Sequence, residues 1–250
     1  RDFCLSRGLG DVYKRQAFQH YTRIVARQIE SVLEALYSTP AGKNTIVIVL
    51  ADHGDGMGSH RMVTKQVSFY EEMTNVPFII AGPGIHPRQK PVEDLLTQPT
   101  IDLLPTLCEL AGIPVPSSKP GISLAPFLKG EKQKRQHPYA ASEWHSEYEV
   151  TVSPGRMIRS PRYKYTHYLE GNGEELYDML KDKGERRNLA HDPKYSKILA
   201  EHRALLDDYI RRTQDDYRSL KVEADKRWRS HAPGYPNHEG PCARDIINRK

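Results

Sequence analysis

Residues 45–58 read TIVIVLADHGDGMG and hold most of what the sequence says about the fold. Thr45 to Ala51 form a short, continuous, mostly β-branched run, which is typical of a strand buried on both faces of a parallel sheet. Asp52 and His53 follow at once, among three glycines. Because α/β sheets bind ligands at the carboxyl ends of their strands, this stretch predicts an α/β fold with a ligand site after Ala51.

Helices and a second strand are expected on either side of this run. Apolar residues recur every three or four positions between Phe18 and Tyr37, which predicts an amphipathic helix that ends at the Pro40–Gly42 break. Downstream, the pattern predicts a helical segment around Val67–Met73 and a buried strand over Val76–Ala81, which the turn Gly82-Pro83-Gly84 closes. It then predicts a helix over Ile101–Ala111 with Gly112 as its stop, and a short helix over Leu124–Leu128.

The composition changes at Lys129–Gln136, a polar and basic run suited to a linker. Three strand-like pieces follow, at Tyr139–Glu143, Arg156–Arg159 and Tyr163–Tyr168. The turn residues Glu170–Gly173 favour a hairpin, a long helix starts near Lys194, and the tail beyond Arg229 is expected to be loosely ordered. The predicted architecture is part of a mixed, largely parallel sheet flanked by helices, then a smaller antiparallel subdomain with a long C-terminal helix.

The overall composition indicates a globular protein. Of its 250 residues 38% are hydrophobic and 28% charged, with a formal net charge of +5 and a pI of about 9.0. The longest apolar run, residues 46–51, is far too short to span a membrane. The basic residues are scattered among acids, which argues against a nucleic-acid partner and suits an anionic substrate. Cys4, Cys108 and Cys242 lack the spacing of metal ligands.

The first sixteen residues are expected to be a sequencing artefact. Residues 11–16 read DVYKRQ, which is the translation of GATGTGTATAAGAGACAG, the end of a transposon used to prepare sequencing libraries. We therefore expect the natural sequence to start near Ala17, so that any signal peptide would have been lost with the true start.

Asp52, His53 and Lys65 carry the candidate chemistry. A carboxylate and an imidazole at one tight turn could bind one divalent cation, since they offer a hard oxygen and a borderline nitrogen ligand. Lys65 could bring a positive charge to the same pocket, and a cation with an ammonium would neutralise a tetrahedral oxyanion. Each residue also has an ordinary alternative: Asp52 as a turn cap, His53 as a hydrogen-bonded core residue and Lys65 as a surface charge.

The order of motifs closely resembles that of the sulfatase family. After the first strand come DHG at 52–54, GSH at 58–60, Lys65, YEE at 70–72, VPFII at 76–80 and GPGI at 82–85. Further on come IDLLPTL at 101–107, AGI at 111–113, RSPRYKY at 159–165, ELYD at 175–178 and NLA at 188–190. These groups stand in family order from Ala17 to about Arg212, so the chain is identified, by resemblance, as the C-terminal portion of a sulfatase.

The resemblance implies a site and its cofactors. It makes Asp52 and His53 ligands of Ca²⁺ or another divalent cation, Lys65 the group that binds a sulfate oxygen, and His60 a residue facing the substrate. The family's nucleophile is a formylglycine made within C-x-P-S-R, a motif absent from residues 17–250; the segment Cys4–Arg7 lacks its proline and its spacing. The full-length protein is therefore expected to hydrolyse sulfate esters of a small molecule or polysaccharide, and this fragment alone to be inactive.

The resemblance also divides the chain. It implies an artefact over 1–16, the C-terminal part of an alkaline-phosphatase-like catalytic core over 17–130, a C-terminal subdomain over 131–230 and a tail over 231–250. Without its first strands, the core is expected to expose sheet edge and apolar surface. Family analogy places the protein in the periplasm or outside the cell. The oligomeric state and the substrate's identity cannot be read from the sequence.

Two other functions stay open. A phosphonate or phosphodiester hydrolase of the alkaline-phosphatase superfamily would share the metal-binding turn, although Lys65 and the ELYD segment favour a sulfatase. A non-catalytic, sulfatase-like carbohydrate-binding protein would have lost only its nucleophile. The presence of Asp52, His53 and Lys65 argues against that second alternative, because a dead site need not keep its metal and anion groups.

Overall fold

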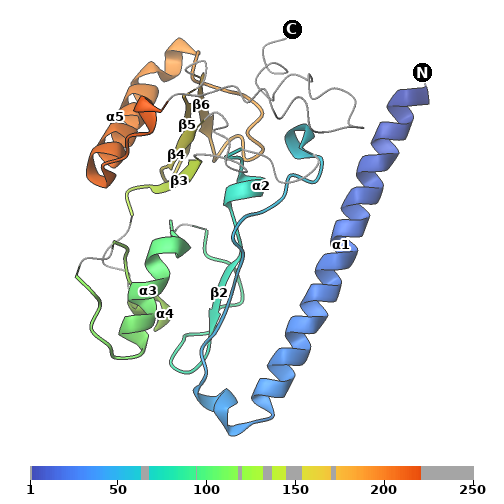
Figure 1. The fold of residues 1–250 in the computed structure, drawn as a ribbon, viewed down its shortest axis with the longest axis vertical. Helices are drawn as coiled ribbons and strands as arrows, with labels where there is room; N and C mark the ends of the chain where they lie inside the picture. Colours follow the sequence, from blue (N-terminus) through green and yellow to red (C-terminus); the bar gives the residue numbers. More distant parts are fainter. Residues whose placement is uncertain are drawn as a thin grey trace.

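The computed structural model describes residues 2–62, 68–93, 95–117, 120–131, 137–144, 154–169 and 173–220, with side chains from Val12 onward except that of Arg61. Lys65, most of the predicted linker, residues 170–172 of the predicted turn and the tail beyond Arg229 lie outside these ranges. Figure 1 shows a long N-terminal helix standing apart, a narrow two-stranded ribbon with short helices beside it, and a four-stranded sheet with a helix against it.

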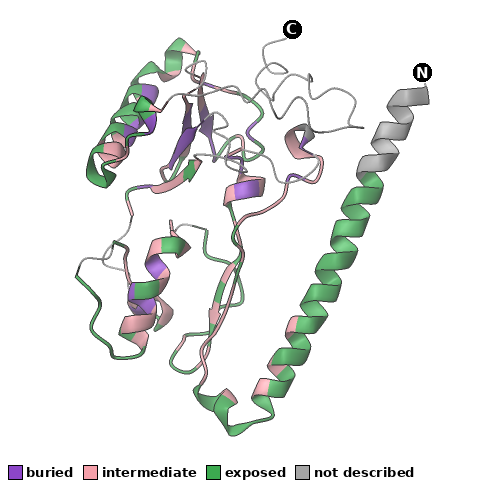
Figure 2. Cartoon of the chain, in the orientation of Figure 1, coloured by how far each residue is buried: buried purple, intermediate pink, exposed green. Residues whose placement is uncertain are grey.

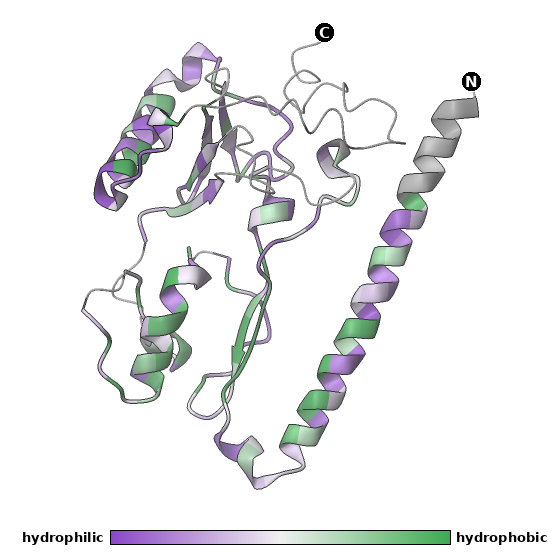
Figure 3. Ribbon diagram, in the orientation of Figure 1, coloured by the Kyte–Doolittle hydropathy of each residue, from purple (hydrophilic) through white to green (hydrophobic). Residues whose placement is uncertain are grey.

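Helix α1 runs from Asp2 to Tyr37, so the predicted helix over 18–37 is confirmed and begins earlier. Its apolar residues are largely uncovered: the exposed fraction is 66% for Tyr21 and 68% for Val32. Hydrophobic and hydrophilic residues alternate along the coloured part of α1 in Figure 3. The helix gives way to a 3₁₀ turn, Pro40–Asn44, at the predicted break. Within the described residues, no helix is both long enough and apolar enough to cross a membrane.

The two predicted buried strands form β1, Val47–Leu50, and β2, Phe78–Ala81. They pair antiparallel, with Val47 opposite Ala81 and Leu50 opposite Phe78, so the expectation of parallel pairing is wrong for these strands. A continuous apolar run indicates that both faces need cover, but it does not fix the direction of the neighbouring strand. The described part of the connection holds a 3₁₀ turn at Ser59–Arg61 and the single-turn helix α2, Glu71–Thr74, which includes the last residues of the helix predicted around 67–73.

Helices α3, Pro99–Leu110, and α4, Ala125–Leu128, confirm the two helices predicted in this region. Gly112 has a φ of +67°, the left-handed conformation that favours glycine, and it ends α3 as expected. The fully buried Asp102 anchors α3, because its carboxylate accepts the backbone N–H groups of Gln98 at 2.7 Å and Ile122 at 2.8 Å. The same carboxylate lies 2.8 Å from His137 Nε2, just before the four-stranded sheet.

The predicted antiparallel subdomain is confirmed as a sheet in the order β3-β4-β5-β6. Its strands are β3 Ala140–Trp144, β4 Gly155–Arg159, β5 Tyr163–Tyr168 and β6 Gly173–Asp178. Helix α5, Ser196–Thr213, is the predicted long helix, and it buries Leu199, His202 and Leu206 against the sheet. The core is one apolar cluster comprising Tyr139, Ile158, Tyr165, Leu176, Leu189, Leu199 and Leu206. We call these four strands the C-terminal sheet, and α5 is the helix that packs on it.

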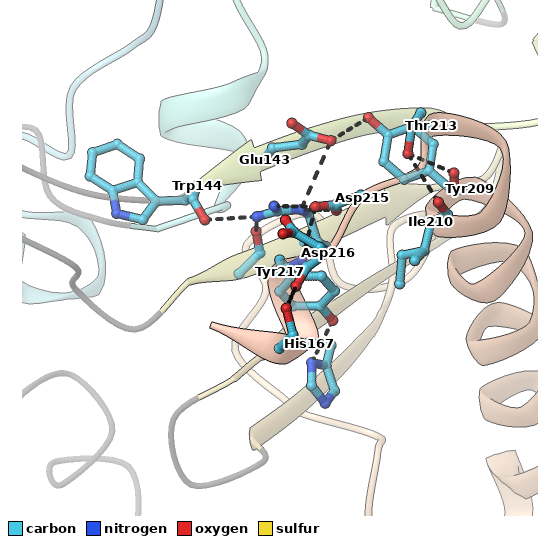
Figure 4. Close-up of polar contacts among 12 residues, drawn as sticks. Glu143, Trp144, His167, Tyr209, Ile210, Thr213, Asp215, Asp216 and Tyr217 are labelled. Carbon is cyan, nitrogen blue, oxygen red and sulfur yellow. Dashed lines mark hydrogen bonds and ion pairs between the residues drawn. The ribbon is translucent and has the colours of Figure 1, made fainter. Parts of the chain in front are cut away.

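A polar cluster closes this subdomain after α5 (Figure 4). The buried Arg156 guanidinium donates to Asp215 through Nε at 2.6 Å and Nη2 at 2.9 Å, and to the carbonyl of Trp144 at 2.8 Å. It also lies 4.4 Å from the ring centroid of Tyr217, whose hydroxyl is 2.8 Å from His167 Nδ1. The segment that follows α5 is thereby fastened across β3, β4 and β5.

Candidate functional site

The candidate site lies in a cleft of about 2910 Å³ between the β1–β2 ribbon and the C-terminal sheet. Asp52 and His53 line this cleft at the end of β1, and Trp144, Met157 and Arg159 line it from the sheet. The position of Asp52 and His53 at the carboxyl end of a strand agrees with the prediction. Arg159, a basic residue at the end of β4, is part of this lining.

Asp52 and His53 converge as the sequence predicted. Asp52 Oδ2 lies 3.6 Å from His53 Nε2, and the side chains are 88% and 39% exposed. His53 Nδ1 is 2.7 Å from the carbonyl oxygen of Gly54, which can only accept, so in the neutral tautomer that fits this contact Nδ1 carries the proton and Nε2 has the lone pair. A histidine that donates one ring N–H to a carbonyl and presents its other nitrogen has the arrangement found in metal ligands.

The residues present fit part of a cation shell. An exposed carboxylate and an imidazole nitrogen stand within 3.6 Å of each other. Two positions further on, Asp55 Oδ1 is buried with no hydrogen-bond partner among the described residues, so this loop holds a polar oxygen in need of a donor or a cation. The described part of the chain contains no group of three or more His, Cys, Asp or Glu side chains arranged to hold a metal. A complete shell would need further ligands.

Glycine is required directly after the candidate ligands. The Gly54 N–H donates to the carbonyl of Met73 at 2.9 Å, and a Cβ on Gly54 would lie 1.8 Å from the Glu72 carbonyl oxygen. The turn that carries Asp52 and His53 therefore rests directly on the backbone of α2. Its geometry depends on where α2 sits.

His60 rests on the same helix. Its backbone is in the left-handed region, with φ +49°, and its ring stacks on Tyr70 with centroids 3.7 Å apart and planes 3° from parallel. Nε2 lies 3.8 Å from Glu72 Oε2, and burial lowers the pKa of His60 below its ordinary 6.5. The described cleft lining includes Asp52 and His53 but not His60, so its role towards a substrate stays a prediction. So does that of Lys65, whose position falls outside the described residues.

Sequence reasoning missed a buried ion cluster beneath α2. Lys164, on β5, is 1% exposed. Its Nζ lies 2.7 Å from Glu71 Oε1 and 3.0 Å from Glu185 Oε1. Burial raises the pKa of the Glu185 carboxyl, which Lys164 partly offsets. No local sequence signal indicates this cluster, because Glu71 and Glu185 are both far from Lys164 along the chain.

A family model and a known protein each match more than half of this chain. A family model for the C-terminal region of N-sulphoglucosamine sulphohydrolase matches residues 58–212. A Delta 4,5-hexuronate-2-O-sulfatase of Bacteroides thetaiotaomicron is 76% identical over 234 residues, which are 94% of this chain and 49% of that protein. The chain thus spans about half the length of this relative.

Two solved structures are also similar to this chain. A 2-O GAG sulfatase superposes with a TM-score of 0.83 at 76% identity and covers 92% of this chain and 50% of its own. A phosphonate monoester hydrolase from Silicibacter pomeroyi superposes with a TM-score of 0.66 at 28% identity and covers 77% of this chain and 40% of its own.

Proposed function

The chain belongs to the sulfatase family, and from that premise we propose that it is the C-terminal half of an enzyme that removes the 2-O-sulfate from Δ4,5-unsaturated hexuronates of sulfated glycosaminoglycans. The observation that carries the proposal is the 76% identity over 94% of the chain to a sulfatase of that description. The Asp52 carboxylate and the His53 imidazole, 3.6 Å apart at the end of β1, support it, because such a pair can hold the cation that assists sulfate-ester hydrolysis.

In this proposal Asp52 and His53 hold a divalent cation, Ca²⁺ by family analogy, together with acids supplied from upstream. The bound cation would neutralise sulfate charge and, with a formylglycine from upstream, supply the nucleophilic chemistry. Asp52 contributes the hard oxygen, and His53 contributes Nε2 while Gly54 holds its ring in place. Lys65 binds a sulfate oxygen, and Arg159 adds positive charge to the wall of the cleft.

We further propose that β1 and β2 belong to a larger mixed, largely parallel sheet in the full-length protein. Leu50 on β1 and Ile79 on β2 are 42% and 58% exposed, whereas strands of this composition are usually covered on both faces. Additional strands and helices from the upstream half would cover them. By the same family analogy, we place the full-length protein in the periplasm or outside the cell.

A phosphonate monoester hydrolase is the second candidate. The structural likeness to the enzyme of Silicibacter pomeroyi, with a TM-score of 0.66, shows that this half of the fold also serves phosphonate chemistry. The difference in identity, 28% against 76%, favours the sulfatase.

The test is to recover the gene upstream of Ala17, express the full-length protein and assay it on both ester classes. Turnover of a 2-O-sulfated unsaturated disaccharide that is lost on adding a chelator supports the proposal. Turnover of phenyl phosphonate monoesters alone moves the assignment to the second candidate. Turnover of neither, with a C-x-P-S-R motif absent upstream, favours a carbohydrate-binding protein. The 250-residue chain itself is expected to show no turnover.

The same DNA sequence tests the proposal that residues 1–16 are translated adapter. The 76% identical match spans 234 residues, as many as follow residue 16. A genomic read in which codons 11–16 continue into a longer uninterrupted gene would contradict it.

A further inference from the structure

Lys164 is an ammonium group placed where no water reaches it. Its side chain is 1% exposed, and Nζ donates to the Phe69 carbonyl at 2.9 Å besides pairing with Glu71 at 2.7 Å and Glu185 at 3.0 Å. All three of its contacts are therefore made within the protein, and two of them, Phe69 and Glu71, lie at the start of α2. Lys164 itself lies on β5, one of the two middle strands of the C-terminal sheet.

Glu185 links the same two elements from the other side. It is buried and has a φ of +49°, a conformation that a non-glycine residue adopts only when its surroundings hold it there. Its Oε2 accepts the backbone N–H of Glu71 at 2.7 Å, while Oε1 faces the Lys164 ammonium. A single carboxylate thus caps the first turn of α2 and neutralises the lysine.

Helix α2 has only four residues, Glu71–Thr74, and a single turn has no stability of its own. Its position must therefore be set by what it is attached to. On one side it is attached to Lys164 and Glu185; on the other it accepts the Gly54 N–H through the Met73 carbonyl at 2.9 Å. Tyr70, the residue before α2, carries the stacked ring of His60.

We propose that Lys164 and Glu185 are positioning residues that hold α2, and through it the Asp52–His53 turn and His60, in the geometry of the site. A buried ion pair contributes little net stability compared with apolar residues of the same volume, but it fixes the relative placement of the groups that it joins. The C-terminal sheet then supports the candidate metal turn without lending it a ligand. The description of this turn as a metal site rests on the proposed function; its attachment to α2 does not.

The first test is site-resolved amide hydrogen exchange on the 250-residue chain. Lys164→Met leaves two carboxylates without their cation and is expected to lower the stability of the whole chain. Exchange at Gly54 is expected to quicken at least about tenfold more than exchange at Ile158 and Leu176 in the C-terminal sheet. The ring-current shift of the His60 ring protons should shrink as well. The matched control is Arg162→Met, which breaks another pair of the same sheet, Arg162 Nη2 to Asp178 Oδ2 at 2.8 Å, but does not touch α2. It should leave Gly54 and His60 unchanged.

Glu185→Gln serves if Lys164→Met does not fold. It keeps an oxygen that can accept the Glu71 N–H but removes the charge that faces Lys164, and the same amides are compared. An equal change at Gly54, Ile158 and Leu176 would mean that the pair only adds general stability, and unchanged exchange at Gly54 would mean that α2 is held by something else. Either result overturns the proposal.

The second test uses the full-length protein and links the pair to the metal. The calcium concentration needed for half-maximal activity is expected to rise about tenfold or more in Lys164→Met and to stay unchanged in Arg162→Met. An unchanged calcium requirement in both variants would mean that α2 does not position the metal site, and would overturn that part of the proposal. If the wild-type protein hydrolyses no sulfate ester, the proposed function fails, and the exchange result alone decides this inference.

Discussion

The strands of the C-terminal sheet are more polar than those of the β1–β2 ribbon, yet the sheet is closed and the ribbon is open. Ile158, Leu176 and Leu206 of the C-terminal sheet and its helix are fully buried, whereas Leu50 and Ile79 of the ribbon are 42% and 58% exposed. Figure 2 shows this contrast, with buried residues concentrated in the sheet and exposed ones along the ribbon and α1. The sheet completes its own core, and the ribbon needs apolar surface from elsewhere.

The contrast teaches that support and chemistry are divided between these regions. The candidate ligands stand at the end of the open ribbon, where Asp52 is 88% exposed, and the buried cluster of Lys164 and Glu185 stands on the closed sheet. Substitutions in the apolar core of the sheet should therefore act on stability, and substitutions at the ribbon's polar end should act on activity. Lys164 and Glu185, which join the two regions, are expected to act on the site as well. Each prediction below tests one side of this division.

The largest effect is expected for Asp52→Ala in the full-length protein. Loss of a metal ligand should lower kcat/KM by about 1000-fold, or about 4 kcal/mol of transition-state stabilisation. The melting temperature should hardly change, because the side chain is 88% exposed. The control is Asp207→Ala on α5, which removes an equally acidic and largely exposed side chain from the closed region. If both variants keep full activity, the ribbon does not carry the chemistry.

Leu206→Ala is expected to lower stability and leave activity unchanged. This side chain is fully buried between α5 and the sheet, so its truncation should lower the free energy of unfolding by about 2–5 kcal/mol. Below the melting temperature kcat should stay unchanged. Denaturant unfolding of the full-length protein, read beside kcat, checks both halves of the prediction. A loss of kcat at full folding would show that the two regions are not divided as proposed.

Gly54→Ala should disturb both properties moderately. The new Cβ would lie 1.8 Å from the Glu72 carbonyl oxygen, so the turn must move away from α2 at a cost of about 1–3 kcal/mol. Because the same movement displaces Asp52 and His53, the calcium requirement should rise. The control is Gly184→Ala, whose Cβ would meet only the Arg186 side chain at 3.5 Å. Equal stability of Gly54→Ala and wild type in thermal melts would contradict the tight packing of this turn.

The closed region was also the more predictable one. Strand β5 was predicted at its observed bounds and α5 within two residues of its start, because their patterns reflect contacts made inside the subdomain. The ribbon was predicted as two strands, but with the wrong direction, because an apolar run does not fix the direction of the neighbouring strand. Burial of Lys164 could not be foreseen, since it depends on Glu71 and Glu185, which are far away in the sequence. The position of the Asp52–His53 pair could be predicted because both residues directly follow a strand in the sequence.

Acid should weaken the closed region through His202. Burial lowers the pKa of this imidazole below its ordinary 6.5, where Nδ1 donates to the Ile198 carbonyl at 2.8 Å and Nε2 lies 2.9 Å from the Ser160 hydroxyl. A base with a depressed pKa binds fewer protons when folded than when unfolded. Its contribution is therefore fully present above pH 6.5 and is lost as the pH falls below that value.

The measurement is the melting temperature of the full-length protein between pH 7.5 and pH 5, a window chosen to span the ordinary histidine pKa of about 6.5. His202→Gln should be less stable than wild type at neutral pH and should lose less stability on acidification. Exposed His191, changed to Gln, is the control and should follow the wild-type curve. Parallel curves for all three proteins would show that His202 does not contribute to the acid sensitivity.

The smallest effect is expected for Ile79→Thr in the 250-residue chain, and its value lies in comparison with the full-length protein. Because Ile79 is 58% exposed here, the change should alter the free energy of unfolding by less than about 0.5 kcal/mol. If upstream strands cover the ribbon, the same substitution in the full-length protein should cost about 1–3 kcal/mol, since it buries a hydroxyl and loses apolar contact. Equal effects in both proteins would mean that this face of the ribbon stays open in the whole enzyme. The contrast between the open ribbon and the closed C-terminal sheet would then be a property of the family fold.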